Sequence, residues 1–180
     1  MHTKLTIFCI AMILIPFLQP SAAPAQRCIS VLPDTKVVTI GMQFTLDVTV
    51  NDSVDSLMGY DVAVGFDRSY LEVVRVDEGS LPATSGYATF FRWLNEACSC
   101  DSILVNGSIL GNTVDGPGTL FTITFKALKL GKANVAILRS DLRNDVNQQL
   151  AHCSEDALVI IEPPIGTESC SWSRVKTLYR

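Results

Sequence analysis

Histidine is almost missing from this 180-residue chain, which contains two. The first, His2, lies in a segment that we expect to be removed, which leaves His152. Nucleophilic Ser-His and Cys-His catalysis uses an imidazole as the proton acceptor, and a histidine-based zinc site needs more than one imidazole. His152 adjoins Cys153, but adjacent side chains of an extended chain point apart. We therefore expect neither a nucleophilic enzyme nor a histidine-based metal site.

Basic charge is also scarce. Lys and Arg number 14 against 18 Asp and Glu, and the formal net charge is −4. Nucleic-acid binding needs a basic patch that gathers phosphates, so this balance argues against a nucleic-acid partner. Acidic residues such as Asp67 and Glu72 are frequent, yet glycoside hydrolysis needs two carboxyl groups that face each other across the scissile bond. The acidic residues lie in predicted turns or on outer strand faces, which gives no sign of such a pair.

Two ligand-binding signatures are missing as well. Pro117 separates the glycines at 116 and 118, which makes this segment a turn rather than a phosphate-binding loop. Residues 141–147 carry Asp and Asn oxygens, but they lack the central Gly and the closing Glu of an EF-hand loop. We therefore expect no cofactor and no bound metal.

The apolar run near the N-terminus is too short for a membrane span. Residues 5–18 are apolar but Pro16 breaks them, whereas a spanning helix needs about 20 apolar residues. Lys4 precedes the run, and Ala23-Pro24-Ala25 follows it as an A-x-A cleavage site. This pattern is typical of a secretory signal peptide. We expect residues 1–25 to be removed near Ala25 and the mature protein to be secreted and extracellular, with no membrane span.

The rest of the chain has the length of one domain, whose usual size is about 100–150 residues. We place this domain at residues 26–162, because Pro163 and Pro164 close the last predicted strand. Residues 163–180 then form a linker and a short C-terminal tail, SWSRVKTLYR. Two interpretations of the tail remain open: a frayed terminus that packs Trp172 loosely, or a short recognition or sorting tail.

Cysteine is present in a pattern that suggests disulfides, which an exported protein can form. After loss of the signal segment five cysteines remain, and all are candidates: Cys28, Cys98, Cys100, Cys153 and Cys170. The odd number leaves one thiol free or intermolecular, and connectivity does not follow from the sequence. We favour one bridge from Cys98 or Cys100 to Cys153 and another that involves Cys28 or Cys170.

Short strands dominate the mature chain. Residues 43–50 and 119–127 alternate cleanly between apolar and polar side chains, as half-buried strands do. Weaker strand signals, separated by turn residues, occupy residues 37–40, 88–94, 103–110, 133–140 and 157–161. Many short strands without a long helical period predict an all-β sandwich.

The most informative segment is residues 57–79, which predicts two strands joined by a turn at residues 67–69. On the first strand one face is hydrophobic, formed by Met58, Tyr60, Val62, Val64 and Phe66. The other face is small and partly polar, formed by Gly59, Asp61, Ala63 and Gly65. On the second strand a change of parity between Val73 and Val74 predicts a β-bulge. The small face is a surface that a partner could cover.

Aromatic side chains near residue 90 offer a second kind of binding surface. Phe91 and Trp93 share one strand face, together with Tyr87 if the strand begins there, and Phe90 shares the opposite face with Arg92. One of these faces must be outside, so we expect an exposed ring. We take Trp93 and Tyr87 as candidate contacts for a glycan.

In order along the chain, these segments resemble the cohesin domain of cellulosome scaffoldins. The resemblance spans about residues 30–162, and the element that begins GYDVAVGFD and continues through LEVVRVDEG is its most recognisable part. The matching text is GMQFTLDVTVND at 41–52, GYDVAVGFDRSYLEVVRVDEGSL at 59–81, SILVNGSIL at 102–110, GTLFTITFKAL at 118–128 and DALVIIE at 156–162.

The resemblance implies a jelly-roll β-sandwich of about nine strands that lacks catalytic activity. It also implies a partner, a dockerin-like protein module, and a role in polysaccharide breakdown, because dockerins recruit enzymes to a scaffold. The family binds through the third, fifth, sixth and eighth strands, which correspond here to residues 58–66, 88–94, 103–110 and 133–140. The partner-binding residues implied are Asp61 as a hydrogen-bond acceptor, its neighbours Gly59 and Ala63, and Asn106, Ser108 and Arg139. The alternative is a carbohydrate-binding module that binds a glycan directly.

Overall fold

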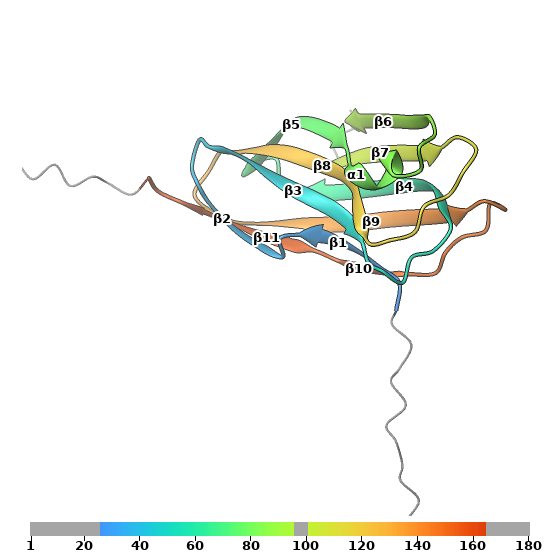
Figure 1. The fold of residues 1–180 in the computed structure, drawn as a ribbon. Coiled ribbons are helices and arrows are strands. Elements are labelled where there is room, and N and C mark those ends of the chain that lie inside the picture. The colour runs from blue at the N-terminus through green and yellow to red at the C-terminus, as the bar shows by residue number, and fades with distance from the viewer. Residues whose placement is uncertain (1–25, 96–100, 165–180) are drawn as a thin grey trace, which may run out of the picture.

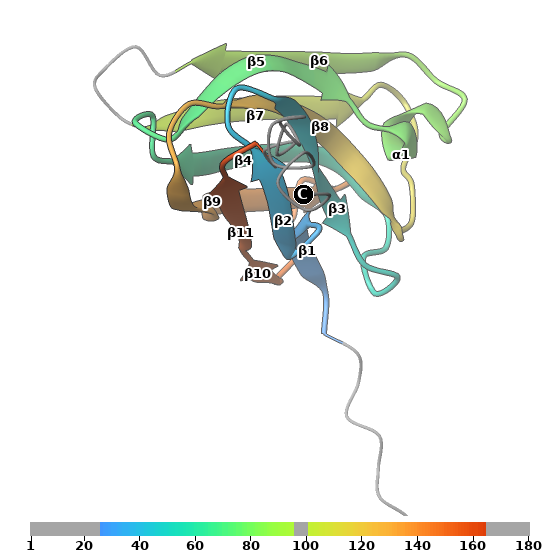
Figure 2. The same ribbon diagram turned by 90° about the vertical axis from the view of Figure 1, so that its left-hand side faces the viewer.

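The computed structural model describes residues 26–95 and 101–164. They form a β-sandwich of a five-stranded sheet, in the order β10-β1-β3-β8-β5, and a six-stranded sheet, in the order β2-β11-β9-β4-β7-β6 (Figures 1 and 2). The strands are β1 (Cys28–Leu32), β2 (Thr35–Thr39), β3 (Gln43–Val50), β4 (Leu57–Phe66), β5 (Leu71–Glu78), β6 (Thr89–Asn95), β7 (Ser102–Ile109), β8 (Gly118–Ala127), β9 (Gly131–Asn144), β10 (Cys153–Glu155) and β11 (Ala157–Glu162). The expected all-β sandwich is confirmed, with about eleven strands rather than nine.

The two additional strands are β1 and β10. They pair in parallel with each other, and β1 also pairs with β3. Ile29 and Val31 of β1 enter the core, whereas β10 is only three residues long and none of its residues is buried. One turn of helix, α1 (Ser80–Ala83), connects β5 toward β6.

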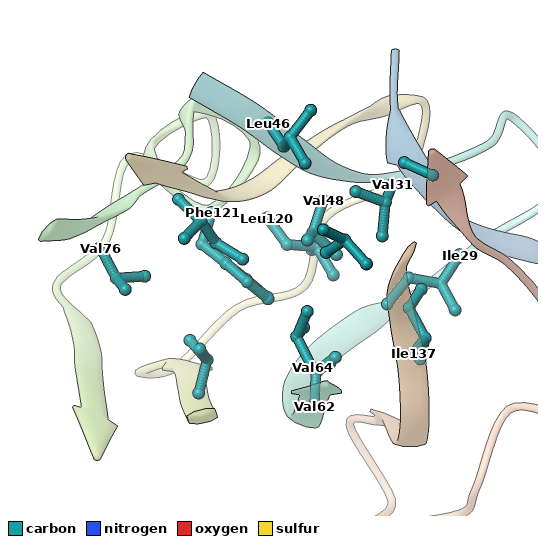
Figure 3. Packing of buried hydrophobic residues seen from close by; sticks show 14 of the residues in the cluster. Ile29, Val31, Leu46, Val48, Val62, Val64, Val76, Leu120, Phe121 and Ile137 are labelled. Atoms are coloured by element: carbon teal, nitrogen blue, oxygen red, sulfur yellow. The ribbon is translucent and has the colours of Figure 1, made fainter. Parts of the chain in front are cut away.

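The core fills the layer between the two sheets. The apolar residues of β3 and β8 that alternate in the sequence all point inward, among them Leu46, Val48 and Phe121, each fully buried. In Figure 3 they face Val62 and Val64 of β4 from the opposite sheet. Phe125 stacks on Phe44 at 5.9 Å and meets Phe66 edge-on at 5.3 Å between ring centroids. This packing fixes the opposite faces of the strands as the outer surface.

Strand β4 follows the predicted alternation except at its first residues. The register of β4 with β9 shifts between Leu57 and Gly59, so Leu57 is buried with 1% exposure and Met58 is not part of the core. The expectation that Met58 points inward is therefore wrong, because the alternation does not continue through the bulge. On β5 the predicted bulge is confirmed, since its register with β8 shifts between Val73 and Arg75.

One disulfide lies within the described residues and joins Cys28 to Cys153, with a Cα–Cα distance of 4.6 Å. The two cysteines are direct partners in the parallel β1–β10 ladder, which brings together residues 125 positions apart in the sequence. The favoured bridge from Cys98 or Cys100 to Cys153 is thus wrong, whereas a bridge that involves Cys28 is confirmed. Cys98, Cys100 and Cys170 lie outside the described residues.

The turn between β4 and β5 is organised by Asp67. Its carboxylate accepts a hydrogen bond from the Ser69 N–H at 2.8 Å, and its carbonyl accepts from the N–H groups of Tyr70 and Leu71. Hydrogen bonding from the Ser69 side chain, and then from its backbone, holds the pKa of Asp67 below its usual value.

This lowered pKa predicts a pH-dependent contribution of the turn to stability. The contribution is present above the unfolded pKa of about 3.9 and is lost as the pH falls through the lower folded value. We expect Asp67→Asn to lower Tm at pH 7 and to change Tm progressively less as the pH falls through that value, measured by thermal unfolding. Asp52→Asn, in the exposed loop after β3, should leave Tm unchanged at every pH. An Asp67→Asn effect independent of pH would contradict the prediction.

Candidate functional site

The predicted binding strands correspond to β9, β4, β7 and β6, which are consecutive neighbours in the six-stranded sheet and share one outer side (Figure 1). We call this surface the outer face. Cross-strand partners share a side of a sheet, so the registers of these strands define its members. They are Gly59, Asp61, Ala63 and Gly65 of β4, Leu104, Asn106 and Ser108 of β7, Phe90, Arg92 and Leu94 of β6, and Leu138, Arg139, Asp141 and Arg143 of β9.

Asp61 is the centre of a hydrogen-bonded group on this face. One carboxylate oxygen accepts from Arg139 Nη2 at 2.9 Å, and the other accepts from Asn106 Nδ2 at 2.7 Å. Three residues implied by the family resemblance, from three different strands, therefore meet at one point. The Asp61 side chain is 37% exposed and that of Arg139 is 62% exposed. A carboxylate offers about four acceptor positions, so Asp61 still has capacity for a partner's donor.

A second ion pair lies beside the first on β9. Arg143 donates from Nε and Nη2 to one oxygen of Asp141, at 2.9 and 2.8 Å, and from Nη1 to the Asn147 carbonyl at 3.0 Å. The other oxygen of Asp141 is buried and has no hydrogen-bond partner among the described residues. The sequence reasoning missed this pair because it ended the strand at residue 140. The buried Leu142, between two charged residues, is the signal that the strand continues.

The end of the outer face near the β9–β10 loop is hollowed. A cavity of about 300 Å³ lies there, lined largely by polar residues: Met58, Gly59, Tyr60, Asp61, Ser108, Asp141, Arg143, Asn144, Asp145 and Asn147. Ser108 is thus placed at the hollow, and its hydroxyl donates weakly to the Met58 carbonyl at 3.4 Å. The flat strip of Gly59, Asp61 and Ala63 runs from this hollow along β4.

Apolar side chains surround the charged centre. Leu138 is 63% exposed and covers Gly65, whose Cβ position would lie 2.8 Å from the Leu138 side chain. On β6 the exposed ring is Phe90, at 50%, whereas Trp93 lies on the inner side and packs against the core. Tyr87 is 56% exposed but precedes the strand and lies near Gly111. The structure thus does not bring the two candidate glycan contacts together on one face.

Among the residues that the structure describes, the remaining titratable side chains do not assemble a reaction centre. His152 Nδ1 donates to the Leu150 carbonyl, and Nε2 is hydrogen-bonded to the Ser140 hydroxyl at 2.7 Å. Burial, and then the Glu78 carboxylate, raise the pKa of the Tyr60 phenol, which donates to the Leu120 carbonyl at 3.1 Å. Across residues 26–95 and 101–164 no group of three or more His, Cys, Asp or Glu side chains is placed to hold a metal. The same residues contain no helix that is long and apolar enough to span a membrane.

Comparisons with solved structures identify the same architecture in other proteins. A non-cellulosomal cohesin from the archaeon Archaeoglobus fulgidus is 17% identical, with 83% of this chain and 98% of that chain covered and a TM-score of 0.64. The sixth cohesin of Acetivibrio cellulolyticus scaffoldin B, solved with a Cel5 dockerin mutant, is also 17% identical, with coverages of 77% and 100% and a TM-score of 0.64. A type I cohesin–dockerin complex from Clostridium thermocellum is 13% identical, with coverages of 77% and 100% and a TM-score of 0.64. These likenesses concern the fold.

Sequence comparison is more specific. No curated protein matches the chain. A family model, described as the cohesin domain, matches residues 30–149, which include β3 to β9 and every residue of the Asp61 group. Cohesin domains are non-catalytic binding modules. The chain belongs to the cohesin domain family.

Proposed function

We propose that this protein is a secreted, non-catalytic module that docks a dockerin-like protein module through its outer face and serves polysaccharide breakdown. The observation that carries the proposal is the Asp61 group, in which a partly exposed carboxylate is held by Arg139 and Asn106 at the middle of the face. Solved relatives of this fold include complexes with dockerins. Their presence among the structural neighbours supports the choice of partner.

The physical character of the face supports a protein partner. A standard interface covers about 800 Å² on each protein, which four neighbouring strands can offer. Asp61 is anchored on both oxygens, so little side-chain entropy is lost when a partner binds it. Opposite charges alternate at the centre, in the pairs Asp61–Arg139 and Asp141–Arg143, and such a pattern favours one orientation of the partner. The exposed Leu138 and Phe90 add apolar contact area at either side.

The test is a binding measurement against calcium-loaded dockerin-type modules from the same genome. We expect Asp61→Ala to weaken binding about tenfold or more, because it removes a charged acceptor and leaves Arg139 without its ion-pair partner. Asp47→Ala is the matched control. Asp47 also accepts a side-chain hydrogen bond, from Thr122 at 2.6 Å, but it lies on the other sheet and should leave affinity unchanged.

Three outcomes would count against the proposal. They are no binding to any such module, equal affinity of wild type and Asp61→Ala, or an equal loss in the Asp47 control. Retention on a glycan, abolished by replacing Tyr87 or Trp93, would favour direct glycan binding instead. Export has its own test, in which the mass of protein recovered outside the cell should correspond to a chain that begins after residue 25.

A further inference from the structure

A sheet edge exposes unpaired backbone groups that can pair with another chain, and proteins commonly block such edges with short strands, charges or bulges. The described sheets have four edge strands: β10, β5, β2 and β6. Strand β10 has three residues and β2 has five. Strand β5 is interrupted by the bulge at Val74 and carries four charged residues: Glu72, Arg75, Asp77 and Glu78. Three of the four edges are therefore protected in these ways.

Strand β6 lacks that protection. It has seven residues, TFFRWLN, with Arg92 as its single charge, and its ladder with β7 runs from Thr89 to Asn95 without a register shift. Phe90 is 50% exposed and Leu94 is 38% exposed. In Figure 2 β6 lies at the top of the molecule, with no other labelled strand beyond it. A regular, apolar edge of this length is suited to pairing with another strand.

The ladder with β7 shows which backbone groups of β6 are free to pair. The Leu110 N–H donates to the Ala88 carbonyl at 2.9 Å, so Ala88 and Leu110 form a hydrogen-bonded pair. Such pairs recur at every second residue of an antiparallel ladder, which turns the backbone groups of Phe90, Arg92 and Leu94 toward β7. The backbone N–H and C=O groups of the alternate residues, Thr89, Phe91 and Trp93, therefore point away from the sheet.

We propose that β6 pairs antiparallel with β6 of a second copy of this chain, about a two-fold axis at Phe91. This register pairs Phe91 with Phe91 and Thr89 with Trp93, and all of these residues have outward-pointing backbone groups. Each such pair exchanges two N–H···O=C bonds. The partly buried Phe91 and Trp93 side chains would gain cover on their remaining open side.

The side chains of the outer face make the edge complementary to itself. With the axis at Phe91, the Phe90 ring of each copy lies directly opposite Arg92 of the other, and a guanidinium over an aromatic ring is attractive. An axis at Arg92 would instead oppose two guanidinium groups, which is unfavourable. An axis at Phe90 would shift Trp93 opposite Tyr87, which precedes the strand. The register at Phe91 pairs Thr89, Phe91 and Trp93 within the strand and avoids the opposed arginines.

This pairing has a consequence for the outer face. Two six-stranded sheets would join edge to edge, and the outer faces of both copies would lie side by side on one continuous sheet. A partner that presents two binding modules could then occupy both, and linked sites raise overall affinity through effective concentration. The dimer itself does not depend on what the outer face binds.

The test is sedimentation equilibrium of the chain over a wide concentration range, with two opposite substitutions at one exposed position. We expect wild type to dimerise. Phe90→Lys should raise the dimer dissociation constant about tenfold or more, because lysine would oppose Arg92 twice in each dimer. Phe90→Glu should retain the dimer, because glutamate would oppose the same arginine with opposite charge. Leu138→Lys, on β9 and away from the edge, is the matched control and should not change the constant.

Because Phe90 is half exposed, both substitutions should keep the fold, which circular dichroism can check. A wild-type chain that stays monomeric at millimolar concentration would overturn the proposal. So would equal effects of Phe90→Lys and Phe90→Glu, since the register requires opposite responses to opposite charges. A dimer equally weakened by Leu138→Lys would place the contact elsewhere and overturn it too.

Discussion

Replacing Cys28 and Cys153 together with serine is expected to lower the free energy of unfolding by about 4–5 kcal/mol. The bridge joins residues 125 positions apart, so it encloses nearly the whole described sandwich in one covalent loop. In the chain-entropy account, closing a loop of this length restricts the unfolded chain strongly, and removing the bridge restores that freedom. No other covalent cross-link within the described residues spans so much of the fold.

The location of the bridge indicates which strands open first when the bridge is removed. Strand β10 is short and pairs only with β1 in its sheet, and it is held otherwise by contacts such as the Cys153 N–H donating to the Arg27 carbonyl at 2.9 Å. We expect hydrogen exchange in β1 and β10 to accelerate in the double variant before the central strands change. The Asp61 group belongs to strands β9, β4 and β7 of the other sheet and should keep its structure.

Denaturant unfolding measures this effect. Ser30→Ala is the matched control, because it removes a non-covalent link between the same two strands, the 2.8 Å hydrogen bond from Ser30 to Glu155. This bond is exposed, and its loss should cost about 1 kcal/mol or less. A double cysteine variant that unfolds at the same denaturant concentration as wild type would show that the bridge contributes nothing to stability.

The strands that pack on one side and meet solvent on the other could be predicted from the sequence. The bounds of β3 agree with the alternation at residues 43–50, and the interior of β4 agrees from Gly59 onward. In such strands the apolar or polar character of each residue follows its burial, because each position is either buried or exposed. The placement of Asp61 and Asn106 on one outer surface follows from the same alternation, combined with the resemblance to cohesins.

The features that were missed depend on contacts distant in the sequence. Strand β10 is too short to show a period, so the partner of Cys28 could not be deduced. At Met58 the alternation was extended through a bulge that only the pairing with β9 reveals. The second half of β9 is obscured by another register shift opposite Ala63 and Val64, which hid Asp141 and Arg143 from the predicted site. In each case the neighbouring strand, and not the local sequence, decides the conformation.

Gly107 faces the core from β7, between two residues of the outer face. Gly107→Ala is expected to destabilise the fold by about 3 kcal/mol. Its hydrogen faces inward against Tyr60, and a Cβ there would lie 2.1 Å from Tyr60 Cζ. The ring cannot move aside cheaply, because it stacks on Phe121 at 6.1 Å and its hydroxyl donates to the Leu120 carbonyl. Displacing it costs packing and a buried hydrogen bond. The neighbours of Gly107 on β7, Asn106 and Ser108, belong to the outer face, so partner binding should weaken as well.

Two further variants separate this cause from a general effect of alanine in a strand. Gly59→Ala is the matched control, because Gly59 lies on the adjacent strand β4 and its Cβ would point to the outer side, 3.5 Å from the nearest atom. It should leave stability nearly unchanged, since 3.5 Å is ordinary contact. Tyr60→Leu should rescue Gly107→Ala in part, because leucine vacates the outer end of the ring that the new methyl group meets. The coupling in this double-mutant cycle should exceed about 1 kcal/mol. Additive losses would show that the Tyr60 ring is not what makes glycine necessary at this position.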